Sequence, residues 1–436
     1  MTAWLIKGAV IAGPGGHGVT DLLLADGTLT AIGAGLSHAG AQVLDAAGLI
    51  ALPGLVDLHT HLREPGREDA ETVETGTRAA ALGGFTAVHA MANTEPVADT
   101  AGVVEQVWRL GRAAGHCDVQ PVGAVTVGLA GTRLAELGTM ADSAARVRVF
   151  SDDGRCVADP LLMRRALEYV KAFDGVIAQH AQDPRLTEDA QLNEGEISGR
   201  LGLAGWPAVA EEAIIARDCL LAAHVGSALH VCHVSTGGSA EIIRWAKSKG
   251  WPVTAEVTPH HLLLTDEVAV GYDPVFKVNP PLRTAADVAE LRRALADGTI
   301  DCVATDHAPH PVEAKETEWS EAAFGMTGLE TALRVVQEAM VDTGLLDWPG
   351  VADRMSVRPA RIGRLTGQGI PLAAGAPANL TLYDPAAPAE AVAPAGASKS
   401  RNSPFAGMEL PGRVVATFLR GTPTVLDGKL AWHDKH

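Results

Sequence analysis

The chain lacks an apolar run long enough to cross a bilayer, and its cysteines form no recognisable pattern. A membrane-spanning helix needs about 20 consecutive apolar residues, whereas the apolar stretch at the amino terminus is interrupted by Lys7 and alternates like a strand. The five cysteines are scattered without a C-x-x-C pair, so they predict no disulfide framework. We therefore expect no membrane partner and a reducing compartment, most simply the cytoplasm.

Positive charge is also scarce. The sequence holds 35 Lys and Arg residues against 52 Asp and Glu residues, which gives a formal net charge of -17 at pH 7. Nucleic-acid-binding proteins need basic surfaces. This balance therefore argues against a nucleic-acid partner, and we interpret the acidity as a solubility feature. With 436 residues the chain is long enough to bury one large core and a smaller second unit.

The order of strand-like and helix-like segments predicts the fold. From Leu55 onward, short strand patterns alternate with Ala-rich helical stretches, which is the signature of repeated βαβ units. The predicted strands are Leu55–Leu58, Ala87–Ala90, Val122–Thr126, Val147–Phe150, Val176–His180, Leu229–His233, Val253–Val257 and Cys302–Thr305. Eight parallel strands with crossover helices predict an α/β fold, a (β/α)8 TIM barrel.

Both ends of the chain carry β patterns of a different kind. Short alternating segments separated by Gly-rich turns occupy the first part, and strand patterns return after Gly375. Because neither end alone has enough apolar strand to fold, we predict that they pair in one small β-sandwich domain. It comprises residues 1–52 and 366–436, and the barrel domain spans residues 53–365.

Polar side chains follow the predicted barrel strands, at the end where TIM barrels carry their chemistry. The stretch L-P-G-L-V-D-L-H-T-H-L-R-E-P-G, from Leu52 to Gly66, places His59 and His61 on the same side of an extended segment. Two imidazoles placed in this way can bind one metal ion. The other polar residues that follow strands are Arg63, Asn93, Asp152, Asp153, His180, His233, His260, His261, Asn279, Asp306, His307 and His310.

Each of these residues alone has an ordinary structural explanation. Asp153 before Gly154 could form a turn, Asp306 could cap a helix, and Arg63 could be a surface charge. We interpret His260 and His261 as groups that pack in the core or support the ligands from behind. Four histidines and two aspartates on one rim are nevertheless hard to obtain by accident, and their joint placement predicts a metal-dependent active site.

Six motifs resemble those of one enzyme family. D-L-H-T-H-L-R-E-P-G, N-T-E-P, S-D-D-G, V-C-H-V-S-T, N-P-P-L-R and D-H-A-P-H are together similar to dihydroorotases of the class I bacterial type, in the amidohydrolase superfamily. The resemblance covers essentially the whole barrel. One departure is Ala92, where proline would be expected before the asparagine, and we expect it to affect loop shape only. The resemblance implies a distorted TIM barrel, a small β domain from both termini, and zinc.

The resemblance also implies a role for each site residue. One Zn²⁺ ion would be held by His59, His61 and Asp306, a second by His180 and His233, and Asp153 would bridge them. Asp306 would also be the catalytic base and acid. The residues that would bind substrate are Arg63, Asn93, Asn279 and His310, with the backbone of Phe324 and Gly325 on a lid of residues 307–325. The implied reaction is the reversible cyclisation of N-carbamoyl-L-aspartate to dihydroorotate, the third step of pyrimidine biosynthesis.

Related cyclic amidohydrolases are the nearest alternatives. Hydantoinases, dihydropyrimidinases and allantoinases use a carbamylated lysine after strand four, and R-E-P-G does not exclude allantoinase. This chain has no lysine between Lys7 and Lys171, and Asp153 stands at that place. A non-catalytic chain that assembles with aspartate transcarbamoylase is a further alternative. Such a chain would have lost ligands, so we favour catalysis, and we expect a homodimer with association to that enzyme left open.

Overall fold

Eight short parallel strands form a closed ring in the computed structural model, which describes residues 3–13 and 18–431. Their bounds are β6 Leu55–Thr60, β7 Phe85–Ala90, β8 Asp118–Pro121, β9 Val149–Phe150, β10 Val176–Gln179, β13 Ala228–Val231, β14 Val253–Val257 and β15 Cys302–Val303. Parallel ladders run from β6 through β7 to β8, and from β9 through β10, β13 and β14 to β15. Parallel bridges between Gly123 and Phe150 and between Thr60 and His307 close the ring. The prediction of a TIM barrel is confirmed.

The third strand lies earlier than predicted. The ladder with β7 runs over Asp118–Pro121, whereas the sequence pattern had indicated residues 122–126. The backbone amides of Val125 and Thr126 donate instead to the Asp152 carboxylate, at 2.8 and 2.9 Å. Val122 and Gly123 still donate to the carbonyls of Ala90 and Val149, but an acidic side chain replaces a neighbouring strand as the partner of Val125 and Thr126. The predicted range of the third strand is therefore wrong.

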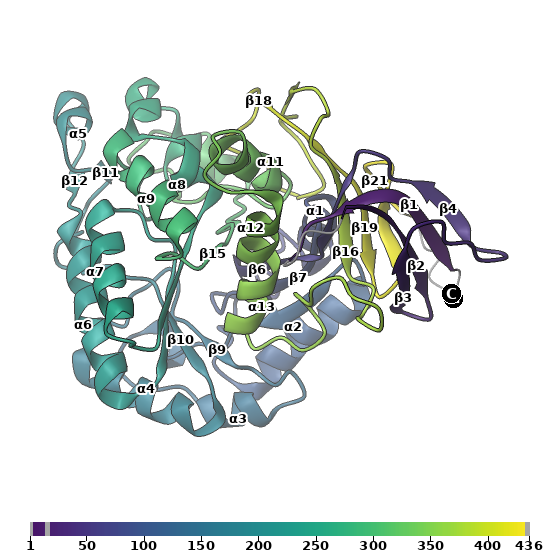
Figure 1. The fold of residues 1–436 in the computed structure, drawn as a ribbon. Helices are drawn as coiled ribbons and strands as arrows, with labels where there is room; N and C mark the ends of the chain where they lie inside the picture. Colours follow the sequence, from purple (N-terminus) through teal and green to yellow (C-terminus); the bar gives the residue numbers. More distant parts are fainter. Residues whose placement is uncertain (1–2, 14–17, 432–436) are drawn as a thin grey trace.

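Helices surround the ring, as Figure 1 shows on the left of the view. The longer ones are α1 Val73–Leu82, α2 Ala101–Ala114, α4 Pro160–Val170, α6 Val209–Val225, α7 Gly237–Ser248 and α9 Ala285–Asp297. The shorter helices are α3 Leu137–Asp142, α5 Glu196–Leu201, α8 Pro259–Leu263, α10 Val312–Lys315, α11 Ala332–Val336, α12 Trp348–Ala352 and α13 Arg358–Ile362. Local chemistry sets their starts: Thr72, Asp159 and Thr284 each accept a hydrogen bond from the first turn of the following helix.

The two ends of the chain share one nine-stranded sheet, in the order β21-β20-β19-β16-β5-β1-β2-β3, with β4 paired to β1. Its strands are β1 Trp4–Ile11, β2 Val19–Ala25, β3 Thr28–Gly33, β4 Gln42–Asp45, β5 Ile50–Pro53, β16 Leu380–Asp384, β19 Arg413–Leu419, β20 Thr422–Leu426 and β21 Lys429–Leu430. The antiparallel pairing of β5 with β16 joins the amino-terminal strands to the carboxyl-terminal ones. The predicted β unit built from both termini is therefore present, beside the barrel.

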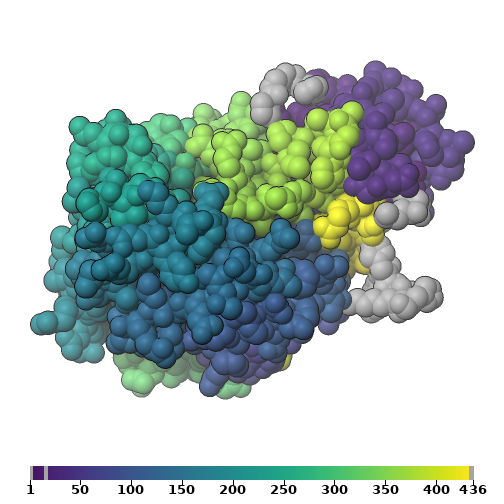
Figure 2. Space-filling model, turned by 90° about the horizontal axis from the view of Figure 1, so that it is seen from below, coloured from purple at the N-terminus to yellow at the C-terminus, as the bar shows by residue number. Residues whose placement is uncertain are grey.

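This sheet has a core of its own and packs closely on the barrel. Trp4 and Phe418 meet edge to face, with ring centroids 5.5 Å apart, among buried aliphatic side chains. The hydroxyl groups of Thr381 and Thr417 donate to the carbonyls of Gly84 and Ala81, at 2.6 and 2.8 Å, just after and within α1. Figure 2 shows the amino-terminal strands as a lobe at one side of the molecule, with carboxyl-terminal strands next to them.

Four further strands of two residues each lie outside both sheets: β11 Leu192–Asn193 pairs with β12 Gly205–Trp206, and β17 Glu390–Ala391 pairs with β18 Glu409–Leu410. No helix in the described part of the chain is long and apolar enough to cross a membrane.

Candidate active site

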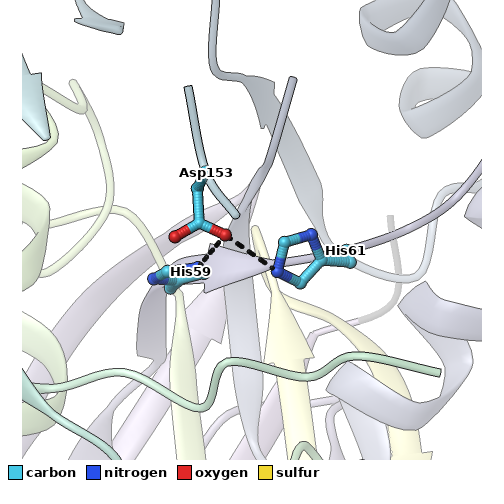
Figure 3. Close-up of side chains that lie close together, drawn as sticks. All are labelled: His59, His61 and Asp153. Carbon is cyan, nitrogen blue, oxygen red and sulfur yellow. Dashed lines mark ion pairs between the residues drawn. The ribbon is translucent and has the colours of Figure 1, made fainter. Parts of the chain in front are cut away.

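The end of strand β6 places the two histidines of the H-x-H motif, His59 in the strand and His61 directly after it, against one carboxylate. Every residue of β6 is buried, and the Nε2 atoms of His59 and His61 lie 3.3 and 3.4 Å from Oδ2 of Asp153. Figure 3 shows both imidazoles turned toward this oxygen. Alternation along an extended strand puts both side chains on the same side, as the sequence predicts.

A second histidine pair faces the other oxygen of the same carboxylate. His180 after β10 and His233 after β13 place Nδ1 and Nε2, respectively, 3.1 Å from Oδ1 of Asp153. The two nitrogen atoms are only 2.8 Å from each other. Asp153 therefore divides its two oxygens between two pairs of imidazoles. Each oxygen of Asp153, with the histidine pair that faces it, forms a group that could hold a metal ion.

Asp306 completes the group from the end of β15. Its Oδ1 atom lies 3.0 Å from Nε2 of His61 and 3.5 Å from Nε2 of His59. Both Asp306 and His233 adopt positive φ angles, 46° and 33°. A non-glycine residue in such a conformation costs about 1–3 kcal/mol and is concentrated at functional sites. The backbone is thus strained where the two side chains turn into the ring.

The donor set fits a divalent transition metal. Four imidazoles and two carboxylates converge in a buried space, and imidazole nitrogen with carboxylate oxygen is a ligand set suited to zinc. The Nε2 atom of His59 is buried and has no hydrogen-bond partner within the described residues, although it faces two carboxylates. A bound cation would satisfy this atom.

The charges of the site explain the protonation of its carboxylates. Burial raises the pKa of Asp153, but the surrounding imidazoles, His59 first, outweigh it and hold the pKa well below its ordinary value. Burial likewise opposes the charged form of Asp306, yet His59 and His61 lower its pKa to about 2. Both carboxylates are therefore anionic at neutral pH, the form that can bind a metal ion.

Further side chains hold the imidazoles from behind. The Nδ1 atom of His59 lies 2.7 Å from Oε1 of Glu256, whose Oε2 lies 3.0 Å from Nε2 of His230. Nδ1 of His61 lies 2.9 Å from Oδ1 of Asn93. These partners direct both Nε2 atoms toward the carboxylates. The sequence analysis overlooked Glu256, although a glutamate inside the apolar strand V-T-A-E-V was a signal that could have identified it.

A cavity of about 430 Å³ opens beside this cluster. Its walls include all the predicted site residues except His59 and His233, namely His61, Arg63, Asn93, Asp153, His180, Asn279, Asp306, His310, Phe324 and Gly325. The structure therefore brings together side chains that follow six different strands of the barrel.

Arg63 is the most informative group on the cavity wall. The residue is 8% exposed, and its Nε donates to the carbonyl of Pro309 at 3.1 Å. No carboxylate of the described residues forms an ion pair with it. Burial, with Arg67 nearby, lowers its pKa to about 10, so the guanidinium stays charged at neutral pH. A buried guanidinium fork without an acidic partner is suited to a ligand carboxylate.

Two more predicted binding residues keep groups available for a ligand. Asn279 donates from Nδ2 to Gln182 at 3.1 Å, while its Oδ1 is buried and has no partner in the described structure. His310 donates from Nε2 to the carbonyl of Phe324 at 2.8 Å. Burial, with Arg63 and Lys315 adding to it, lowers the pKa of His310 to about 3, which keeps the ring neutral. The cavity thus presents a cation, an amide oxygen and a neutral imidazole.

Other residues on the rim serve the framework instead. Asp152 accepts hydrogen bonds from the amides of Val125 and Thr126, which follow the third strand. His307 contacts Glu71 and the amide of Gly328. His261 contacts Thr258 and the carbonyl of Pro281, whereas Nε2 of His260 is buried without a partner in the part of the chain that is described.

Comparison with known proteins places the chain in a family. A family model described as dihydro-orotase-like matches residues 48–239. The chain is 69% identical to the dihydroorotase of Streptomyces coelicolor, over 99% of this chain and all of that protein. It is 70% identical to the dihydroorotase of Leifsonia xyli subsp. xyli, over 98% of this chain and 96% of the relative. The chain is 56% identical to the dihydroorotase of Mycobacterium tuberculosis, over 98% of this chain and 99% of the relative.

Solved structures of related enzymes share the architecture. The L-hydantoinase of Arthrobacter aurescens superposes with a TM-score of 0.88 at 27% identity, over 99% of this chain and 98% of that one. The dihydropyrimidinase of Brevibacillus agri superposes with a TM-score of 0.82 at 22% identity, over 99% of this chain and 96% of that one. At this identity the comparison shows a shared fold alone. With more than half of its residues shared with dihydroorotases along nearly its whole length, and with metal-ligating groups at the ends of its barrel strands, this chain belongs to the dihydroorotase family.

Proposed function

We propose that this chain catalyses the reversible, zinc-dependent ring closure of N-carbamoyl-L-aspartate to dihydroorotate. The observation that carries the proposal is that Arg63 and Asp153 line the same cavity. The guanidinium of Arg63 is buried and forms no ion pair with the described residues, and the two oxygens of Asp153 face two pairs of histidines. A cyclic amide that also carries a carboxylate needs both features. The names of the relatives support the same substrate.

In the hydrolytic direction, water adds to the ring amide carbonyl, the bond from that carbon to the ring nitrogen breaks, and the nitrogen gains a proton. The residues that would hold metal are His59, His61, Asp153, His180, His233 and Asp306. Bound metal would supply an activated water and polarise the carbonyl. Asp306 accepts the proton of the water and returns it to the leaving nitrogen. Ring closure reverses these steps and releases water.

The remaining polar groups orient the substrate. Arg63 pairs with the carboxylate that takes no part in the reaction, because its planar fork matches two oxygens. Asn93 has its Oδ1 against His61, so its amide N–H groups can serve a substrate acceptor. Asn279 offers the opposite group, an unpaired oxygen, to a ring N–H. The segment 307–325, which carries His310, Phe324 and Gly325, covers one side of the cavity.

The test compares substrates on one metal-analysed sample. We expect kcat/KM for dihydroorotate to exceed that for hydantoin and allantoin by at least ~100-fold, because only dihydroorotate can use Arg63 in full. Mass spectrometry of the same sample should find two zinc ions per chain. A preference for hydantoin would contradict the substrate assignment, and another metal would contradict zinc.

Two further predictions accompany this function. We propose a homodimer, for which association with aspartate transcarbamoylase stays open, and the division into a barrel of residues 53–365 and a β domain of residues 1–52 and 366–436. Light scattering of the purified chain, alone and mixed with aspartate transcarbamoylase, tests the homodimer and the association. Limited proteolysis that releases fragments ending near residues 53 and 365 tests the division.

A further inference from the structure

Lys315, at the end of α10, is a buried lysine that the proposed chemistry does not use. The residue is 6% exposed, and its Nζ donates to three backbone carbonyls, those of Lys277, Ala323 and Gly325, at 3.1, 2.9 and 3.0 Å. An ammonium group has three N–H donors, so all three are used. No carboxylate of the described residues forms an ion pair with it.

The three carbonyls come from two segments that both reach the cavity. Lys277 lies two residues before Asn279, and Ala323 and Gly325 flank Phe324. The Gly325 amide also donates to the Lys277 carbonyl, at 2.9 Å. The ammonium of Lys315 therefore ties the segment 323–325 to the segment that carries Asn279.

Gly325 packs closely against Ala308 and His310, so its position affects the cavity wall. Gly325 has a φ of +140°, and a Cβ atom at this residue would meet Ala308 and Nε2 of His310 at 2.8 Å. The imidazole of His310 in turn bonds to the Phe324 carbonyl. A shift of this segment would displace His310 and the cavity wall together.

A second lysine binds the same loop. Nζ of Lys277 donates to the carbonyls of Trp319 and Ser320, at 2.6 and 3.1 Å, and lies 4.5 Å from the centroid of the Phe324 ring.

Burial, with Lys277 adding to it, lowers the pKa of Lys315 to about 7. A lysine kept where its charge is disfavoured is typical of functional positions.

We propose that Lys315 is a positioning residue that fixes the cavity wall formed by residues 323–325 against the segment that carries Asn279. It contacts no substrate. It acts by holding the Phe324 and Gly325 backbone, and His310 through them, in the arrangement that receives the ligand. The inference deepens the proposed function and rests on it for the identity of that ligand.

The test removes the ammonium and measures the loop as well as the reaction. In Lys315→Met we expect the KM for dihydroorotate to rise at least ~10-fold with kcat changed less than ~3-fold, because a binding wall is lost while the metal ligands stay. Metal content should be unchanged, and the melting temperature should fall, because three buried carbonyls lose a donor. Amide hydrogen exchange should accelerate at Ala323 and Gly325, whose N–H groups bond to Ala314 and Lys277.

Two further variants complete the experiment. Lys171→Met is the matched control, because Nζ of Lys171 also donates to a backbone carbonyl, that of Val225 at 2.7 Å, but is exposed and lies before β10. It should behave like the parent. Lys315→Gln keeps two N–H donors, so its KM and exchange rates should lie between those of the parent and Lys315→Met. If Lys315→Met does not fold, the KM and the exchange rates of Lys315→Gln test the proposal.

Unchanged KM and unchanged exchange in both Lys315 variants would overturn the proposal. So would a loss of metal in step with activity, since Lys315 would then support the metal site and the fold as a whole. If the parent itself does not turn over dihydroorotate, the proposed function is wrong. The exchange rates of residues 323–325 then decide alone whether Lys315 holds this wall.

Discussion

Glu256 shows how a single side chain controls the metal site without lining the cavity. Its two oxygens bind His59 and His230, and the residue is 1% exposed. Burial opposes its charge, but both histidines outweigh it and lower the pKa of Glu256. We expect Glu256→Gln to weaken metal binding by ~10–100-fold, the usual effect of removing the partner of a metal-bound histidine.

A competition titration with a chelator measures this metal affinity directly. Glu74→Gln is the control, because Glu74 forms only an exposed ion pair with Arg78 on α1. Equal metal dissociation constants for Glu256→Gln and the parent would show that Glu256 does not orient His59.

The proposed role of Asp153 as the bridging ligand predicts that the metal site needs no carbamylated lysine. We expect Asp153→Ala to lose bound zinc, because two nearby cations would lose the anion that screens them. Asp152→Asn is the control: it keeps an oxygen for the amides of Val125 and Thr126, so zinc should be retained. A carbamate forms from carbon dioxide, whereas here stripped protein should regain activity with zinc alone. A requirement for bicarbonate would remove Asp153 from the bridge.

At the scale of elements, one glycine brings two loops of the site together. Gly66, after β6, has a φ of +97°, and a Cβ there would lie 2.0 Å from the carbonyl oxygen of Glu95. The loop that contains Glu95 also carries Asn93, which contacts His61. We expect Gly66→Ala to lower kcat/KM at least ~10-fold, because small displacements of positioning groups are costly.

The matched control for this variant is Gly115→Ala. Gly115 ends α2 with a similar φ of +74°, but nothing lies within 4 Å of its Cβ position. It should lose about 1 kcal/mol of stability through strain and keep its kinetics. Parallel losses of kcat/KM in the two variants would show that backbone strain alone, and no loop displacement, explains the effect of Gly66→Ala.

The elements also show what could be predicted from the sequence. Strand ends could be located because apolar runs stop at His59, His180 and His233, and a barrel gathers such ends on one rim. The third strand could not be placed, since Asp152 takes the hydrogen bonds of residues 125 and 126. The role of Lys315 was also hidden, because one of its carbonyl partners lies 38 residues away and hydrogen bonds to backbone carbonyls carry no side-chain signature.

At the scale of the whole molecule, hydroxyl groups attach the β sheet to the barrel. Thr381 is fully buried and donates to the Gly84 carbonyl at 2.6 Å. We expect Thr381→Val to lower the free energy of unfolding by about 1 kcal/mol, because a buried hydrogen bond is lost and the Gly84 carbonyl keeps only the Leu55 amide as its donor. Urea denaturation of the metal-loaded protein measures this. Thr30→Val, whose hydroxyl bonds to Leu23 on the exposed side of the sheet, should change it by less than ~0.5 kcal/mol. Equal losses would contradict a special role for the contact with the barrel.

The pairing of β5 with β16 also affects how the protein is made. Strand β5 ends at Pro53 and its partner begins at Leu380, so the ribosome must add more than 300 residues before the two can meet. At ~5–20 residues per second this takes roughly a quarter of a minute to a minute. During that time one edge of β5 has no native neighbour, and unpaired edges favour association between chains. Nascent chains of this protein are therefore exposed to mispairing until the last strands emerge, so its yield should depend on translation speed and on chaperones.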